Sequence, residues 1–149
     1  QQISIAAAST VVARLAAELD GTGLFPTASQ FVERGLQVLR GPARRVAAIH
    51  GVALALASGS LQLHAGLSVD ELTARLVALP GVGPWTAGYV AMRVLGAPDV
   101  LLSTDLVLLK GAHRLGLPAT PKGIAEYANR WAPFRSYAGM HLWRAAQSP

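Results

Sequence analysis

Asp105 is the residue whose setting most directly suggests chemistry. It lies in the apolar run Leu101–Leu109. A carboxylate among aliphatic neighbours can hold a negative charge opposite a cation that develops during a reaction. The same carboxylate could instead cap a helix that starts here and interact favourably with its macrodipole. The sequence leaves both interpretations open.

A glycine turn, Pro80–Pro84, precedes this carboxylate. Gly81 and Gly83 can adopt positive φ and leave backbone amides uncovered, and Pro84 suits the first position of a helix. The partial positive charge at such a helix N-terminus favours a phosphate group. A turn of this kind can also be a simple helix connector.

Aromatic side chains follow the turn. Trp85 and Tyr89 are four residues apart and share one face of the expected helix, which Met92 approximately continues. Such a stripe can belong to a hydrophobic core. Because it begins beside the turn, its aromatic faces could instead stack on a nucleobase.

The elements that must position these residues are helical. Apolar periodicity and capping signals predict about eight helices, little strand and an all-α, compact multi-helix domain. The expected helices cover about 3–19, a short segment after Thr27 or Ser29, 42–57, 68–79, 84–95, 103 or 104–115, 120–130, and a last segment ending near 146. Asp99 is expected to cap or solvate its own loop, and Trp131 to be a core residue.

Composition narrows the function classes. The chain has 149 residues, of which 52% are hydrophobic and 14% charged, so one domain with a sizeable core is expected. The absence of cysteine excludes a disulfide framework, a thiol nucleophile and a cysteine-ligated metal centre. A net charge of +5, with arginine dominant among the basic residues, favours a polyanionic partner. The four histidines are too scattered for a metal site, and polar residues interrupt the longest uncharged stretch, so no membrane partner is expected.

The run Leu79–Arg114 resembles the helix–hairpin–helix and Gly/Pro-Asp signature of the base-excision DNA glycosylase superfamily. In that family a hairpin of the form L-P-G-V/I-G precedes a helix bearing an essential Asp. Here the hairpin is Leu79–Gly83 and the matching carboxylate is Asp105. The tail Tyr127–Trp143 is similar to the alkylpurine branch, that of bacterial 3-methyladenine DNA glycosylase II (AlkA-like). The opening Gln1–Ser4 resembles the start of the second helix of that domain.

This resemblance implies an enzyme that flips a damaged base out of double-stranded DNA and hydrolyses its N-glycosidic bond. Asp105 would be catalytic, and the base pocket would be lined by Trp85, Tyr89 and Trp143. Strand-cleaving relatives carry a lysine where Trp85 stands, and Lys110 lies on the following helix beyond Asp105. A tryptophan has no amine for a Schiff base, so a monofunctional enzyme for 3-methyladenine-type alkylated purines is expected, without lyase activity.

The resemblance also implies DNA-backbone contacts from Gly81, Val82, Gly83, Thr86, Arg44 and Arg45. No cofactor is required, although a structural K⁺ or Na⁺ could bind the backbone carbonyls of Leu79 and Val82. The residue that wedges the duplex would be Leu24 or Phe25.

We expect residues 1–149 to form a single helix–hairpin–helix glycosylase domain that lacks the first helix of the family and any N-terminal domain. We further expect a monomer in the cytoplasm, associated with the nucleoid. Two other interpretations remain: a non-catalytic helix–hairpin–helix DNA-binding module, and an inactive fragment of a multidomain repair protein.

Overall fold

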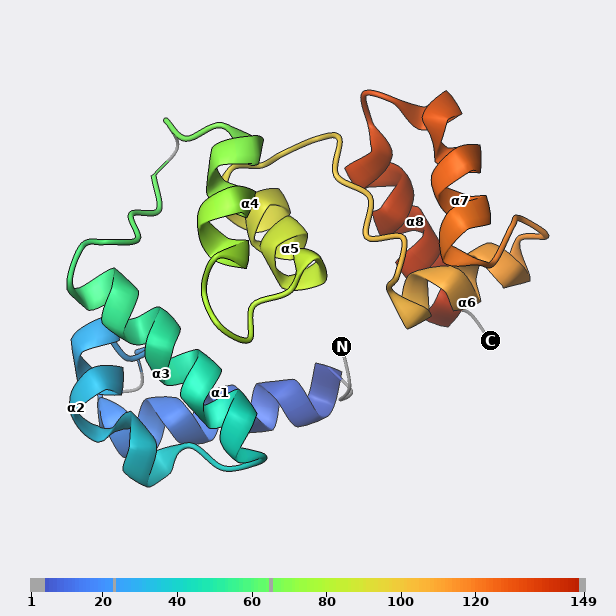
Figure 1. The fold of residues 1–149 in the computed structure, drawn as a ribbon. Coiled ribbons are helices and arrows are strands. Elements are labelled where there is room, and N and C mark those ends of the chain that lie inside the picture. The colour runs from blue at the N-terminus through green and yellow to red at the C-terminus, as the bar shows by residue number, and fades with distance from the viewer. Residues whose placement is uncertain (1–4, 23, 65, 148–149) are drawn as a thin grey trace. The chain divides into compact units, whose positions relative to one another are not determined.

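The computed structural model describes residues 5–22, 24–64 and 66–147. Over these residues the chain forms eight α-helices, one short 3-10 helix and no strand (Figure 1), which confirms the all-α prediction. The match proposed for Gln1–Ser4 lies outside the described residues. The elements are α1 Ile5–Leu19, α2 Ala28–Val38, α3 Ala43–Ala57, α4 Val69–Val77, α5 Pro84–Val94, α6 Leu106–Arg114, α7 Pro121–Tyr127, η1 Ala128–Trp131 and α8 Arg135–Gln147. None of these helices is long and apolar enough to cross a membrane.

The chain divides into two compact units, of which the first draws on Gln1–Gln62 and Arg75–Val82. It contains α1, α2 and α3, and α2 packs against both of the others. Its core is a single apolar cluster, and removal of these side chains from water stabilises the three-helix arrangement. The buried members are Leu15, Leu19, Phe31, Val38, Leu39 and Ala53.

Local capping explains where two of the helices begin. The hydroxyl of Thr27 accepts a hydrogen bond from the Gln30 amide at 3.3 Å, and the Gln30 side chain accepts one from the Thr27 amide at 2.7 Å. This is a complete capping box. Ser68 accepts from the Glu71 amide at 3.1 Å at the start of α4. Both starts agree with the predicted signals, whereas α4 ends at Val77, two residues before its expected end.

The second unit comprises Leu63–Ala74 and Gly83–Pro149. In it α6 packs closely against α8, and Gly111 is the point of closest approach. A Cβ atom at Gly111 would lie 1.9 Å from the Leu142 carbonyl oxygen, so only glycine lets the two backbones meet. The cluster around them buries Leu108, Ala112, Ile124 and Leu142, and Trp131 packs against it as predicted.

The start of α6 differs from the prediction. Ser103 or Thr104 was expected to cap this helix, but the N-cap is Asp105, whose side chain accepts from the Leu108 amide. The reason is a turn just before it, in which the Asp105 amide donates to the Leu102 carbonyl at 2.9 Å. The chain therefore enters helical geometry only after Asp105. The cap interpretation of this carboxylate is confirmed.

Candidate active site

The Asp105 carboxylate is buried, with 4% exposure, and accepts three N–H hydrogen bonds. Oδ1 accepts from the Leu108 amide at 2.8 Å and from Trp143 Nε1 at 3.1 Å. Oδ2 accepts from Trp85 Nε1 at 2.8 Å. An ionised carboxylate only accepts hydrogen bonds, so these donors match its charge and fix its orientation. Oδ1 therefore accepts two hydrogen bonds, whereas Oδ2 accepts one and can accept another.

The three donors come from α5, α6 and α8, and glycines set the spacing of those elements. Trp143 directly follows Leu142, whose backbone meets Gly111 of α6. On α5, a Cβ atom at Gly88 would lie 2.9 Å from Leu102 Cδ2, so α5 lies close to the segment that leads into Asp105. Small residues at these contacts let both indoles reach one carboxylate.

Two of the predicted pocket aromatics, Trp85 and Trp143, donate to this carboxylate, and the third, Tyr89, contacts both of their rings. Trp85 and Tyr89 stack with their ring centroids 5.4 Å apart and an interplanar angle of 8°. Tyr89 and Trp143 are 6.1 Å apart and tilted by 57°. All three side chains are half-buried. The structure thus brings Trp85, Tyr89, Trp143 and Asp105 together, while their role toward a flipped base stays a prediction. The sequence predicted ring faces here and gave no sign that two indole N–H groups would donate to Asp105.

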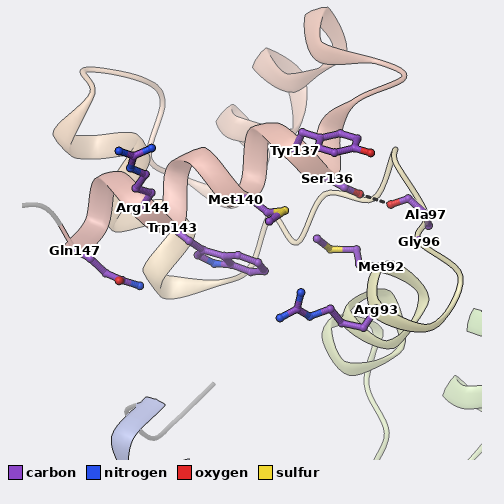
Figure 2. Close-up of a pocket in the computed structure, with 10 residues that line it drawn as sticks. All are labelled: Met92, Arg93, Gly96, Ala97, Ser136, Tyr137, Met140, Trp143, Arg144 and Gln147. Atoms are coloured by element: carbon purple, nitrogen blue, oxygen red, sulfur yellow. Dashed lines mark hydrogen bonds between the residues drawn. The ribbon is translucent and has the colours of Figure 1, made fainter.

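A cleft of about 390 Å³ opens beside Trp143, between α5 and α8 (Figure 2). Met92, Arg93, Tyr137 and Met140 line it together with Trp143. The α5 side of the cleft continues the helical spacing of Trp85 and Tyr89, so that spacing could have identified Arg93. The α8 side carries no comparable signal in the sequence.

The connection from α5 to α6 is held by the start of α8. The buried Ser136 hydroxyl donates to the Ala97 carbonyl at 2.7 Å and accepts from the Val100 amide at 2.9 Å. Arg135 donates to Asp99 through Nε and Nη2, both at 2.6 Å. The expectation that Asp99 caps or solvates its own loop is wrong, because this carboxylate instead binds Arg135, 36 residues along the chain. The side-chain hydrogen bond from Arg135 lowers the pKa of Asp99, against a smaller opposing effect of burial.

The two glycines of the hairpin turn differ in backbone conformation and in the space around them. Gly81 has φ +84°, and a Cβ there would lie 2.5 Å from Ala48 Cβ, so Gly81 is required for packing on α3. Gly83 has φ −97° and is the N-cap of α5, so it does not use the positive φ that glycine allows. A Cβ at Gly83 would meet nothing within 4 Å. Among the described residues no acceptor is recorded for the amides of Gly83, Trp85 and Thr86, as is usual in a first helical turn.

The hairpin carbonyls retain capacity for a cation. The Leu79 carbonyl accepts one hydrogen bond, from the Val82 amide at 3.1 Å. No hydrogen bond to the Val82 carbonyl is recorded in the described part of the chain. Carbonyl oxygens of this kind suit hard cations, so the donor set fits a monovalent ion, and a K⁺ or Na⁺ there stays a prediction. No group of three or more His, Cys, Asp or Glu side chains suited to a metal occurs within the described ranges.

The remaining predicted DNA contacts belong to the first unit. Arg44 and Arg45 are exposed in the first turn of α3. The wedge candidates Leu24 and Phe25 are also exposed, and the ring of Phe25 lies 5.8 Å from that of Phe31. Asp105 and the three aromatic residues gathered with it all belong to the second unit. The roles of these first-unit residues stay predictions.

Known proteins resemble this chain throughout its length. It is 40% identical over 158 residues to the "probable bifunctional transcriptional activator/DNA repair enzyme AlkA" of Mycobacterium tuberculosis, covering 100% of this chain and 32% of that protein. It is 34% identical to "DNA-3-methyladenine glycosylase 2" of Escherichia coli, covering 96% of this chain and 53% of that one. The chain therefore spans about a third and about half of the lengths of these two relatives. No family model matches the sequence.

Two solved structures share the fold. The Schizosaccharomyces pombe 3-methyladenine DNA glycosylase Mag1, in complex with abasic DNA, superposes with a TM-score of 0.87 at 27% identity, covering 100% of this chain and 78% of that one. A DNA-3-methyladenine glycosidase from Bacillus halodurans superposes with a TM-score of 0.77 at 31% identity, covering 99% and 71%. The likeness therefore includes the segments that hold Asp105 and its three donors.

Proposed function

Because the chain belongs to the AlkA-like family of 3-methyladenine DNA glycosylases, we propose that it excises alkylated purines of the 3-methyladenine type from double-stranded DNA. The observation that carries this proposal is the buried Asp105 carboxylate, held by three N–H donors beside a group of aromatic rings. A fixed negative charge in such a setting suits a reaction that develops positive charge.

The proposed reaction breaks the bond between the base nitrogen and the anomeric carbon of the sugar. The bonding electron pair leaves with the base, and the sugar becomes an oxocarbenium ion. The negative charge of Asp105 stabilises that ion, with Oδ2 facing the reaction because Oδ1 already accepts two hydrogen bonds. Water then adds to the anomeric carbon and loses a proton, which leaves a free base and an abasic site.

Entry of the base requires its rotation out of the DNA stack. This flipping costs a few kcal/mol, less for a damaged or badly paired base. Alkylation at N3 or N7 makes a purine cationic, and aromatic faces attract cations by about 0.5–2 kcal/mol each. The rings of Trp85, Tyr89 and Trp143 would supply such faces next to Asp105.

Water, rather than an enzyme amine, is the proposed nucleophile. By the family resemblance, Trp85 stands where strand-cleaving relatives carry a lysine, and its indole N–H donates to Asp105. Lys110 is exposed on α6. An activity without strand cleavage is the expected result.

The proposed DNA grip uses the hairpin, the first turn of α5 and two arginines of α3. The amides of Gly83 and Thr86 at the start of α5 can donate to a phosphate, and the open side of Gly83 permits close approach of a strand. Gly81 and Val82 precede them in the turn, and Arg44 and Arg45 would add charge. A K⁺ or Na⁺ held by the carbonyls of Leu79 and Val82 would add positive charge at the turn. The partner would be duplex DNA containing a damaged base, bound by one copy of the chain.

The decisive experiment compares wild type with Asp105→Asn for release of free 3-methyladenine from methylated duplex DNA. An asparagine can still accept from the Leu108 amide, so α6 keeps its cap. Its NH₂ group would face the Trp85 N–H, and the negative charge would be lost. We expect about a 10²–10³-fold loss of rate.

Asp70→Asn is the matched control, because Asp70 is an exposed carboxylate in the first turn of α4. We expect it to excise at the wild-type rate. DNA binding without base release by wild type would contradict the proposed activity and favour a non-catalytic binding module. Equal rates for wild type and Asp105→Asn would contradict the role of Asp105.

A further inference from the structure

Three side chains form a ladder along one face of α5. Trp85, Tyr89 and Arg93 are spaced by four residues, so each lies one turn from the next. The Trp85 and Tyr89 rings stack at 5.4 Å, and the Arg93 guanidinium carbon lies 5.5 Å from the Tyr89 ring centroid. Arg93 Nε is also 3.4 Å from the Tyr89 hydroxyl oxygen.

The ladder places a neighbour on each side of Tyr89 along the helix. Trp85 contacts the Tyr89 ring from the preceding turn, and Arg93 contacts it from the following one. The Arg93 guanidinium therefore already makes a cation–π interaction with this ring. A flipped base beside Asp105 would share the Tyr89 ring with these two neighbours.

Arg93 also faces the cleft that Trp143 lines. Figure 2 shows its side chain extending from α5 toward the side on which Trp143 projects from α8. No carboxylate partner of Arg93 is recorded within the described residues. A guanidinium offers five N–H donors, no acceptor and a permanent positive charge. The Arg93 guanidinium carbon is 5.5 Å from the Tyr89 ring centroid, which is itself 6.1 Å from the Trp143 centroid, so the guanidinium lies within about 12 Å of the Trp143 ring. This separation is comparable to the distance over which salt screens charges.

We propose that Arg93 determines which damaged bases the site prefers. Its charge disfavours cationic alkylpurines, and its N–H donors favour uncharged purines that carry an acceptor atom on the edge facing the cleft. This inference rests on the proposed glycosylase function, and it assigns Arg93 a specificity role that is separate from the charge of Asp105.

The test uses two purines that share the O6 acceptor and differ in charge. Single-turnover excision is measured on duplexes carrying one 7-methylguanine, which is cationic, or one hypoxanthine, which is neutral. The quantity compared is the ratio of the two rate constants. In Arg93→Gln we expect this ratio to shift toward 7-methylguanine by about 2- to 10-fold, the range for unit charges about 12 Å apart at an effective dielectric constant of about 20, with and without salt screening.

Two variants control the interpretation. Arg93→Lys keeps the charge and should keep the ratio close to that of wild type. Arg130→Gln is the matched control, because the Arg130 guanidinium also lies over a tyrosine ring, 3.8 Å from the centroid of Tyr127, which in turn contacts Trp131. Neither Tyr127 nor Trp131 is hydrogen-bonded to Asp105, so we expect the loss of the Arg130 charge to leave the ratio of the two excision rate constants unchanged.

The outcomes separate this inference from the function on which it rests. If Arg93→Gln slows both substrates by the same factor, Arg93 binds DNA phosphate and the inference is wrong. An unchanged ratio, or an equal shift in Arg130→Gln, also overturns it. If wild type releases neither base, the proposed function itself fails.

Discussion

Replacement of Trp143 by phenylalanine would remove one hydrogen bond from Asp105 while keeping an aromatic ring on α8. The lost bond is the 3.1 Å contact from Nε1 to Oδ1, after which Oδ1 retains only the Leu108 amide. A hydrogen bond to a charged group contributes about 1.5–3 kcal/mol. If the carboxylate must be held in place for the transition state, excision should slow by about 10- to 150-fold.

The assay is single-turnover release of 7-methylguanine, with affinity for a duplex carrying an abasic-site analogue measured in parallel. We expect the loss in the rate constant and little change in affinity, because the ring that would stack on the base remains. Trp131→Phe is the control, since Trp131 packs against the same α6–α8 cluster without a hydrogen bond to Asp105. Excision by Trp143→Phe at the rate of Trp131→Phe would refute the view that this indole N–H positions the carboxylate.

Two further perturbations test the surrounding framework. Gly81→Ala should destabilise the fold by about 1–3 kcal/mol, because the new Cβ would lie 2.5 Å from Ala48 Cβ and φ is positive, whereas Gly83→Ala should change the thermal midpoint little. A calorimetric scan of both variants would contradict this if their midpoints fell equally. Arg135 lowers the pKa of Asp99 from its ordinary 3.8, so the pair should stabilise the fold above pH 3.8 and cease to do so as the pH falls through the lowered value. The difference in thermal midpoint between wild type and Asp99→Asn should therefore shrink on acidification, and a difference independent of pH would disprove this origin.

Local sequence signals predicted the helices well because their causes are local. Thr27 and Ser68 mark helix starts through bonds to residues three positions away, and the periodic apolar residues indicated the buried faces. At Asp105 the cap interpretation is confirmed, and the functional one stays a prediction that the cap does not exclude, because Oδ1 accepts from both the Leu108 amide and the Trp143 indole.

The features that the sequence did not predict depend on residues far apart in the chain. Asp99 and Arg135 are separated by 36 positions, and Asp105 and Trp143 by 38. Periodicity shows which face of a helix is apolar. It does not show which side-chain N–H donor will bond to which carboxylate elsewhere in the chain. The stripe on α5 likewise identified aromatic faces, while the donor direction of the Trp85 indole depends on how α5 packs beside the start of α6.

The contact at Gly111 has a consequence for how this site can change during evolution. Because α6 meets α8 backbone to backbone at Gly111, no residue with a Cβ can occupy that position unless the two helices move apart. Trp143 directly follows Leu142, so such a movement would also draw the Trp143 indole away from Asp105. We therefore expect sequences that keep this site to keep glycine at position 111.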